Sequence, residues 1–588
     1  MRPFASYRTF HFMDRRRFIV TGFSAAAAGT ALASDACSGN IGNSLSPGPL
    51  SPQGPVYDLT VQYALTNIKG YKLRTRTYQG RTIAPMIQTR PGDTLTMRII
   101  NHLPPNPPAA PPMGSVLIPD VRDSMEAMDP HFHGGVKRSD EINLMNNPHG
   151  FNTTNLHVHG IQTIPHIFYP LGTTDPRAPM LEIDPGKNFL YNFPVPADHP
   201  SGLHWYHPHK HGSTDVQVSG GMAGLLVVRG PIDEVPEIAA AREIFVAVQS
   251  LNVNPSKTHP GTYDREYIAY RTKENGGYAF GTDYTMLTVN GEGVYWVLNE
   301  TDHKPPYLTP LGVPEYAVRP GEVVRLRLLN GTNFLPLLLA LPGFETWAIG
   351  FDGVNTLKPL AIDMSGEGVT EITPENLFTA PIQLAAQAKR IELLLRAPAK
   401  EGSYVLSSLA SDRIVPALGK EFEIARFVVT GSPVRMGIPT SLPVPTREYP
   451  IISDKAIVAR RTFYFGQGER RDLLTGFGFT IDGELYQEMV CATRPKVGTC
   501  EEWRLENKTV DLHPFHLHEN SFQLFAINDK PVDPISIHDT FSIPPKHDGV
   551  NGSLTIRVRF KQWYGKTVFH CHAVTHEDTG MMQNILMT

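Results

Sequence analysis

One phrase recurs three times along the chain. It reads RPGDTLTMRIIN at 90–101, RPGEVVRLRLLN at 319–330 and, more loosely, VGTCEEWRLEN at 497–507. Each copy is a polar turn with glycine followed by alternating apolar and polar residues, the pattern of a β-strand with one buried face. Three copies in 588 residues, a length too great for a single core, predict three related β-sandwich domains. We place them at 56–230, 231–435 and 436–588, with SLPVPTREYP (441–450) as the linker into the third.

The composition also favours an all-β fold. The chain holds 50 glycines and 52 prolines, and long amphipathic helical patterns are scarce, which indicates many short strands joined by turns. Charged residues make up 19% and hydrophobic residues 41%, as in globular rather than disordered proteins. The formal net charge is −4 and the sequence has no basic stripe, so we expect no nucleic-acid partner.

The first 33 residues have the features of an export signal. Arg15-Arg16-Arg17-Phe18 opens a moderately apolar run that ends at Ala31-Leu32-Ala33, a small-x-small cleavage pattern. This is similar to a twin-arginine signal, so we expect residues 1–33 to be a signal peptide, 34–55 a linker, and the protein to be periplasmic or secreted. The run is too short and alanine-rich for a stable membrane span, and no transmembrane segment is predicted.

A proline-rich insertion, residues 104–153, interrupts the first predicted domain. It begins near LPPNPPAAPP and contains HFHGG (131–135) and NNPHG (146–150). A proline-rich stretch of this length is expected to be a loop. HFHGG has an HxHG pattern but does not lie beside strand-like sequence, so we do not expect His131 and His133 to belong to the main metal site.

Four histidine clusters stand out among the 23 histidines of the chain. They read NLHVHG (155–160), HWYHPHKHG (204–212), HPFHLH (513–518) and HCHAVTH (570–576), and each contains an HxH pair. On a strand, residues i and i+2 point to the same side, so each pair presents two imidazoles together. Eight imidazoles exceed what a structural zinc site uses, and imidazole also suits copper, iron and nickel. The pairs are His157/His159, His207/His209, His516/His518 and His570/His572.

The same alternation separates Cys571 from its two neighbours. If His570 and His572 face one way, the thiol of Cys571 between them faces the other. A thiolate with two imidazoles and a distant methionine sulfur is the arrangement of blue-copper electron-transfer sites. His513, His576 and Met581 are the nearby residues that supply these ligands, so the segment around Cys571 would link two metal centres.

The four clusters, in this order and in the first and last predicted domains, closely resemble those of multicopper oxidases. Within that family the chain resembles bacterial laccases and copper-efflux oxidases, whose chains end in a motif very similar to HCHAVTHEDTGMM (570–582). The resemblance covers the chain after the signal and implies three cupredoxin-like Greek-key β-sandwich domains in tandem. It also implies four copper ions per chain, dioxygen as one reactant and a small reducing substrate as the other, and we expect a monomer.

The family's ligand roles transfer to this sequence residue by residue. The resemblance implies a type 1 copper on His513, Cys571 and His576, with Met581 as the axial ligand. It implies a type 2 copper on His157 and His516, at the interface of the first and third domains. The two type 3 coppers would share the remaining six histidines, which are His159, His207, His209, His518, His570 and His572.

Carboxyl groups matter because reducing dioxygen to water consumes protons. Glu577, directly after His576, matches the glutamate of the family's ending and is the expected proton relay. The family also has an aspartate after the HxHG motif, but here that stretch reads GIQTIPHIFYPLGTTD, and Asp175 is the candidate that remains. After HLH this chain has Glu519-Asn520 where many relatives have Gly-His, which we expect to affect the surroundings of the site and not its ligands.

The sequence does not identify the reducing substrate. A laccase acting on phenols and aromatic amines is one hypothesis, and a metallo-oxidase acting on Cu(I) or Mn(II) is a second. The 17 methionines are scattered without a methionine-rich run, which favours the laccase hypothesis. A non-catalytic copper-binding protein is a third, which the complete set of twelve ligand positions disfavours. Cys491 and Cys500 flank a predicted turn, and either a disulfide or two free thiols fits the sequence.

Overall fold

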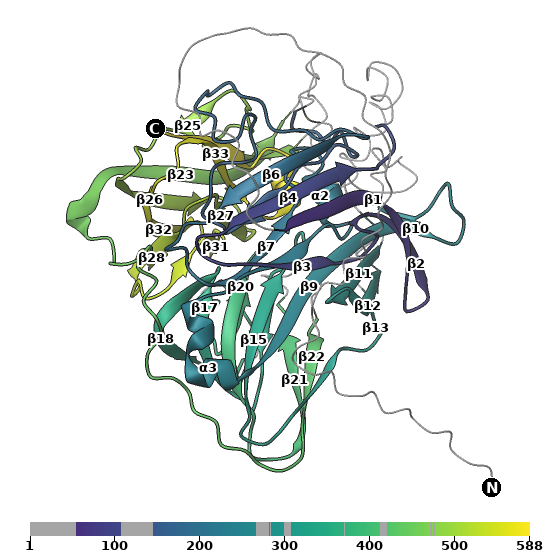
Figure 1. Cartoon of the computed structure of the whole chain (residues 1–588), viewed down its shortest axis with the longest axis vertical. Helices are drawn as coiled ribbons and strands as arrows, with labels where there is room; N and C mark the ends of the chain where they lie inside the picture. Colours follow the sequence, from purple (N-terminus) through teal and green to yellow (C-terminus); the bar gives the residue numbers. More distant parts are fainter. Residues whose placement is uncertain are drawn as a thin grey trace. The chain divides into compact units, whose positions relative to one another are not determined.

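The computed structural model describes residues 55–106, 145–265, 282, 284–298, 307–369, 371–374, 376–411, 420–470, 473 and 477–588 (Figure 1). The predicted signal peptide, nearly all of the linker 34–55 and most of the insertion, with its HFHGG segment, lie outside these residues. Strands dominate the described part and its helices are single short turns, which confirms the predicted all-β fold.

The strands fall into three consecutive groups. The first group comprises β1 (Val56–Ile68), β2 (Tyr71–Tyr78), β3 (Ala84–Thr89), β4 (Thr94–Asn101), β5 (His157–His159), β6 (Asn188–Pro194), β7 (Gly202–His207) and β8 (Gly224–Val228). The second comprises β9 (Arg242–Pro255), β10 (Tyr263–Asp264), β11 (Tyr284–Val289), β12 (Glu292–Leu298), β13 (Tyr307–Pro310), β14 (Glu315–Val318), β15 (Val323–Asn330), β16 (Leu337–Ala340), β17 (Glu345–Phe351), β18 (Val354–Ile362), β19 (Gln383–Ala385), β20 (Arg390–Arg396), β21 (Gly402–Ser408) and β22 (Phe422–Val429).

The third group carries the C-terminal motifs. It comprises β23 (Ile457–Glu469), β24 (Phe477–Ile481), β25 (Cys491–Thr493), β26 (Cys500–Asn507), β27 (His513–Leu517), β28 (Phe522–Ile527), β29 (Lys530–Pro531), β30 (Ile537–His538), β31 (Thr540–Ile543), β32 (Gly552–Arg559), β33 (Gly565–Cys571) and β34 (Met582–Met587). The α-helices are α2 (Thr214–Val218), α3 (Pro236–Ala240) and α4 (Val574–Asp578), and the 3₁₀ turns are η1 (Pro231–Glu234) and η3 (Asp454–Ala456).

The three copies of the repeated phrase occupy equivalent places in these groups. They form β4, β15 and β26, and each pairs in parallel with the first strand of its own group, which is β1, β9 or β23. On its other side each pairs antiparallel with a later strand, β6, β20 or β32. The repeat in the sequence is therefore a repeat in structure, because the same alternating pattern takes the same central position in each sheet.

Each repeated strand ends in a buried asparagine that holds the following turn. The side chains of Asn101, Asn330 and Asn507 donate to loop carbonyls, and their Oδ1 atoms accept the backbone N–H two residues later. Asn330, for example, donates to the carbonyls of Leu335 and Ala385, both at 2.8 Å. Because a buried turn leaves backbone groups without water, an amide side chain with both donors and an acceptor satisfies them.

Three large hydrophobic cores follow the same division. The buried residues of these cores run from Leu59 to Val228, from Ile244 to Val429 and from Phe463 to Met587. The cores lie within the predicted ranges 56–230, 231–435 and 436–588. One sheet of 13 strands, however, continues from the second group into the first through β9, β10 and β2, and β17, β20, β15 and β9 lie side by side in it (Figure 1). The domain boundaries themselves stay a prediction.

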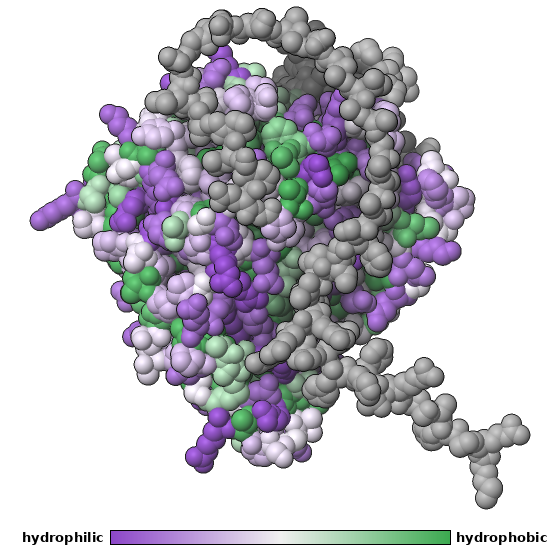
Figure 2. All heavy atoms as spheres, viewed as in Figure 1, coloured by the Kyte–Doolittle hydropathy of each residue, from purple (hydrophilic) through white to green (hydrophobic). Residues whose placement is uncertain are grey.

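Two further expectations concern the thiols and the membrane. Cys491 and Cys500 are both free thiols, so of the two alternatives the structure has the one without a disulfide. Among the described residues, no helix is long and apolar enough to cross a membrane. On the face shown in Figure 2, hydrophilic and hydrophobic residues are interspersed over the coloured part of the surface.

We expect Asn330→Ala to lower the free energy of unfolding by about 2–4 kcal/mol, since it removes the side-chain donor to two buried carbonyls and the acceptor of one buried N–H. Urea denaturation followed by tryptophan fluorescence measures this. Asn376→Ala is the matched control, because the side chain of Asn376 bonds backbone groups near the surface, where water can replace it. Equal effects of the two substitutions would contradict the structural role of the repeated asparagine.

Candidate metal centre

Two strand pairs bring the four HxH motifs together. In the first group, β5 pairs antiparallel with β7, with His157 opposite His207. In the third, β27 pairs antiparallel with β33, with His516 opposite His570 and Phe515 opposite Cys571. All eight HxH histidines are buried, although imidazole is seldom fully buried without a partner.

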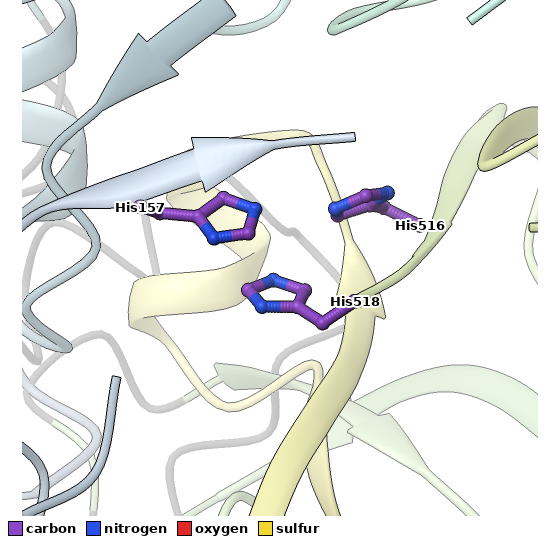
Figure 3. Close-up of side chains that lie close together, drawn as sticks. All are labelled: His157, His516 and His518. Carbon is purple, nitrogen blue, oxygen red and sulfur yellow. The ribbon is translucent and has the colours of Figure 1, made fainter. Parts of the chain in front are cut away.

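The eight imidazoles meet in one cluster between the first and third groups. The Nε2 atom of His570 lies 3.1 Å from Nε2 of His209 and 3.1 Å from Nε2 of His518. Nε2 of His207 lies 3.5 Å from Nδ1 of His159. Figure 3 shows His157, from β5, facing His516 and His518 on and just after β27, and the rings of His157 and His518 stack with centroids 3.9 Å apart.

Several ring nitrogens in this cluster have no hydrogen-bond partner among the described residues. They include Nε2 of His157, Nε2 of His516 and both nitrogens of His572. Unpartnered nitrogens converging in a buried space are costly unless something electrophilic lies among them. Nitrogens of His209, His518 and His570 lie close enough together to share one metal ion, as do those of His157, His159 and His207. The residues therefore fit a site for several ions bound by imidazole.

Burial keeps these histidines in the neutral form that binds metals. Desolvation, followed by the repulsion between neighbouring rings, lowers the pKa of His157, His518 and His570 well below the usual value for histidine. For His207 the pKa falls to about 3, chiefly through burial. Neutral imidazole has a free lone pair, so the cluster needs no deprotonation before it binds a metal at neutral pH.

A second set of ligands lies on the other face of β33. Cys571 belongs to the apolar core of the third group together with Phe515, Phe569 and Met581. Its Sγ lies 3.5 Å from Nδ1 of His513 and 3.6 Å from Nδ1 of His576. The Cys571 amide donates to the Met581 carbonyl, which ties Met581 to this place in the chain. The alternation expected around Cys571 is thus present, with the thiol opposite to the flanking imidazoles.

The turn after the third repeat holds the ring of His513. The hydroxyl of Thr509 donates to Oδ1 of Asn507 at 2.8 Å and lies 2.7 Å from Nε2 of His513. Because that hydroxyl already donates, it accepts a hydrogen bond from the N–H at Nε2 of His513. This leaves Nδ1 of His513 without a proton, facing Cys571. Burial raises the pKa of the Cys571 thiol, so the free thiol is protonated and a bound cation is needed to hold it as a thiolate.

Buried carboxyl groups line the large cluster. Glu577, on α4, lies 3.4 Å from Nδ1 of His209 and 3.2 Å from Nδ1 of His570. Burial, and then the neighbouring Asp578, raises the pKa of Glu577 well above its ordinary value. Asp578 accepts hydrogen bonds from the amides of Gly212 and Asp215, and burial raises its pKa to about 7. Glu577 therefore lies where the sequence predicted an acid.

The other predicted acid lies elsewhere. Asp175 is exposed, and its carboxylate accepts the amide of Arg177 within its own turn. Asp539 lies beside the cluster instead: its Oδ1 is 3.3 Å from Nε2 of His159, and Arg390 binds both of its oxygens. Burial raises the pKa of Asp539 to about 6 even beside that guanidinium. No motif identifies Asp539 in the sequence, because it reaches the site only through the folding of β30 and β31.

Three histidines outside the four pairs also make buried contacts. His166 contacts His157, with its Nε2 3.0 Å from Nδ1 of that ring. His538 lies 2.8 Å from the ammonium of Lys389, which also binds Asp352 and connects the second group to the third. His211 is buried against Tyr486. No strand or helix periodicity predicts these contacts, because each is made through a loop or between different groups of strands.

Comparison with known proteins decides the family. Residues 135–232 and 464–588, which contain all four histidine clusters, match two sequence profiles described as multicopper oxidase. The chain belongs to the multicopper oxidase family. It is therefore a copper-dependent oxidoreductase, and membership implies dioxygen and a reducing substrate as its reactants. The recognition of the family from its motifs is confirmed.

Individual relatives of this oxidase are distant over most of its length. It is 26% identical to "Multicopper oxidase mco" of Staphylococcus haemolyticus over 465 residues, covering 77% of this chain and 81% of that protein. It is 23% identical to "Laccase" of Bacillus subtilis, covering 68% of this chain and 73% of that protein.

Solved structures share the fold. McoA of Aquifex aeolicus superimposes with a TM-score of 0.63 at 20% identity, covering 91% of this chain and 97% of that one. The laccase-like CueO of Ochrobactrum sp. gives a TM-score of 0.60 at 20% identity, covering 92% and 100%. At such low identity these matches establish the cupredoxin-type architecture. They do not identify the substrate of this oxidase.

We expect the copper-free oxidase to lose stability as the pH falls below about 6.5. A buried histidine whose pKa is lowered stays neutral in the folded state but takes up a proton when unfolded, so each removes about 1.4 kcal/mol per pH unit below that value. Buried carboxyls with raised pKa act in the opposite direction, but Glu519, Asp539, Glu577 and Asp578 are fewer than the ten histidines of the two ligand sets. Melting temperatures between pH 7 and 5 measure this, and a value that rises toward pH 5 would contradict it.

Proposed function

We propose that this chain is a laccase-like multicopper oxidase with four coppers in two connected sites. His513, Cys571 and His576 hold the type 1 copper, with Met581 as its axial ligand. His157 and His516 hold the type 2 copper, and the other six histidines of the HxH pairs hold the type 3 pair. Copper bound at these positions supplies one-electron transfer at the thiolate set and the four-electron reduction of dioxygen to water at the imidazole set.

The observation that carries this proposal is the position of Cys571. Its thiol lies within 3.6 Å of two imidazole nitrogens, while His570 and His572, bonded to it on either side, belong to the eight-histidine cluster. One short covalent segment therefore joins the two ligand sets. A protein that only stores copper has no need for such a connection, whereas an enzyme that takes electrons at one site and uses them at another does.

The proposal divides the imidazoles into groups of three, three and two, and the nitrogen distances support the group of His209, His518 and His570 and the pairing of His159 with His207. His209, His518 and His570 converge through their Nε2 atoms, and His159 and His207 approach through Nδ1 and Nε2. The unpartnered Nε2 atoms of His157 and His516 are then left for the type 2 ion. Asymmetric use of Nδ1 and Nε2 is what lets several rings from different strands reach one ion without clashing.

Carboxyl groups of the chain can hold the protons that water formation needs. Burial raises the pKa of Glu577 well above its ordinary value, which favours its protonated form, and it faces the Nδ1 atoms of His209 and His570. Asp578, with its pKa near 7, adjoins it in α4 and is fixed by two backbone amides of the first group. This order supports a role for Glu577 as the proton donor beside the cluster.

Aromatic side chains around His576 support an organic reductant. Phe479 stacks on the ring of His576 with centroids 3.7 Å apart, and Phe334 meets it edge-on at 5.6 Å. Phe334 is 39% exposed, so it can contact a substrate at the surface. Among the solved structures that share the fold, one from Campylobacter jejuni is titled a metallo-oxidase. The Cu(I) and Mn(II) alternatives therefore belong in the test of the substrate.

Cys571→Ser tests the assignment of the type 1 site. We expect loss of the blue colour, about one copper fewer per chain, and a fall in oxygen consumption of more than about 100-fold, because the serine hydroxyl does not replace a thiolate ligand. Optical absorption, copper analysis and an oxygen electrode measure these. Cys500→Ser is the matched control, since Cys500 is a buried thiol of the third group, at the start of β26. Normal turnover by the Cys571→Ser variant would refute the assignment.

Oxygen consumption with a phenol, Cu(I) and Mn(II) on one preparation identifies the reductant. We expect the phenol to be oxidised, and Phe334→Ala to raise its KM by about 2- to 10-fold, since an aromatic contact contributes about 0.5–1.5 kcal/mol. Phe334→Ala should leave the rates with Cu(I) and Mn(II) unchanged, because these metal ions do not stack on the Phe334 ring. Turnover with a metal ion alone would favour the metallo-oxidase.

A further inference from the structure

His157 differs from His207, His516 and His570 in the group that its Nδ1 atom contacts. Nδ1 of His207 faces the carbonyl of Pro208, Nδ1 of His516 faces that of Asp539, and Nδ1 of His570 faces that of Cys571. A carbonyl only accepts, so each of these rings carries its proton on Nδ1 and presents Nε2. Nδ1 of His157, in contrast, faces a side chain, since it lies 3.0 Å from Nε2 of His166.

The contacts of His166 fix the direction of that hydrogen bond. The amide of Val158 donates to Nε2 of His166 at 3.2 Å, so this nitrogen carries no proton. Nδ1 of His166 lies 3.0 Å from the carbonyl of Ile164, which accepts its hydrogen bond, and 3.4 Å from Oε1 of Glu519. His166 is therefore protonated on Nδ1, and Nε2 accepts from Nδ1 of His157. This leaves Nε2 of His157 without a proton, buried and without a partner.

Glu519 is held in an unusual conformation at the end of this chain of contacts. Its φ is +54°, in the left-handed region that residues other than glycine seldom adopt. Its side chain is nonetheless buried, and one oxygen accepts the hydroxyl of Thr567 while the other faces His166. Backbone strain at a buried carboxyl indicates that this position of the side chain has a purpose.

We propose that Glu519 and His166 are positioning residues that hold His157 in the tautomer whose Nε2 binds the type 2 copper. The inference rests on the proposed assignment of His157 to that copper. Outer hydrogen-bond partners of this kind fix the orientation and tautomer of a metal-bound histidine, and their loss typically weakens metal binding by 10- to 100-fold. In this chain the support comes from two side chains, so substitution can remove it, as it cannot remove a backbone carbonyl.

His166→Phe is the primary test, with His199→Phe as its control. The two histidines are both buried, and each has one ring nitrogen on a backbone amide and one on a backbone carbonyl, which are Gln162 and Pro200 for His199. Only His166 contacts His157. A general loss of packing or backbone hydrogen bonds therefore affects both variants, whereas loss of the tautomer affects the His166 variant alone.

The measurements are copper content after dialysis and the electron paramagnetic resonance spectrum. We expect His166→Phe to retain its blue absorption but to lose about one copper per chain, with a weakened type 2 signal or a changed type 2 hyperfine splitting. The control should keep both signals of the unmodified oxidase. An unchanged type 2 signal and copper content in the His166 variant would overturn the proposal. An unmodified oxidase without any type 2 signal would instead refute the proposed function.

Glu519 is tested by a conservative and a non-conservative substitution. The amide oxygen of Glu519→Gln can still accept from Nδ1 of His166, and its NH₂ can reach Thr567, so we expect the type 2 signal to be retained. Glu519→Leu fills a similar volume without an acceptor, and we expect it to shift the type 2 hyperfine splitting in the direction seen for His166→Phe. The same spectrum for both Glu519 variants would remove Glu519 from the proposal and leave only His166.

Discussion

The pairing of β27 with β33 is the constraint on which both ligand sets depend. It places His516 opposite His570 on one face and Phe515 opposite Cys571 on the other. Because the side-chain period of a strand is two, a slip of one residue would exchange the two faces and bury imidazoles in the apolar core. The core that contains Phe515, Phe569 and Cys571 therefore fixes the register, and the register in turn fixes on which face each proposed metal ligand of these two strands lies.

Contacts between the groups of strands complete the cluster. Asp578 in α4 binds the amides of Gly212 and Asp215 at the start of α2, which holds the third group against the first. The second group supplies no HxH motif but contributes two buried cations. Lys389 forms an ion pair with Asp352, and Arg390 forms one with Asp539, which lies beside the histidines. Such a buried ionic network adds little net stability. It does hold its members in one arrangement, since removing one partner leaves an unpaired buried charge.

Features of the site could be predicted from the sequence where they depend on residues close together along the chain, and not where they depend on distant segments. His570, Cys571 and His572 could be assigned to opposite faces because alternation along one strand is local. Glu577 could be found because it follows a ligand directly in the motif. Asp175 was the candidate for a second acid only by its position after the HxHG motif, and it lies exposed in its own turn. Asp539, His166 and Glu519 reach the cluster across β-strand pairings and loops, which no local pattern encodes.

The sequence by itself determined the strand repeat, the all-β class and the membership of the family, and it predicted twelve ligand positions, because each of these depends on short spacings along the chain. Only the tertiary structure decided which nitrogen of each ring is available, which carboxyls lie beside the histidines, and that Cys491 and Cys500 stay apart as free thiols. These depend on contacts that only the folded chain makes, some between segments hundreds of residues apart, such as the contact of His166 with Glu519. The physical reason is that a ligand type is a property of a residue, whereas its tautomer and protonation are properties of its surroundings.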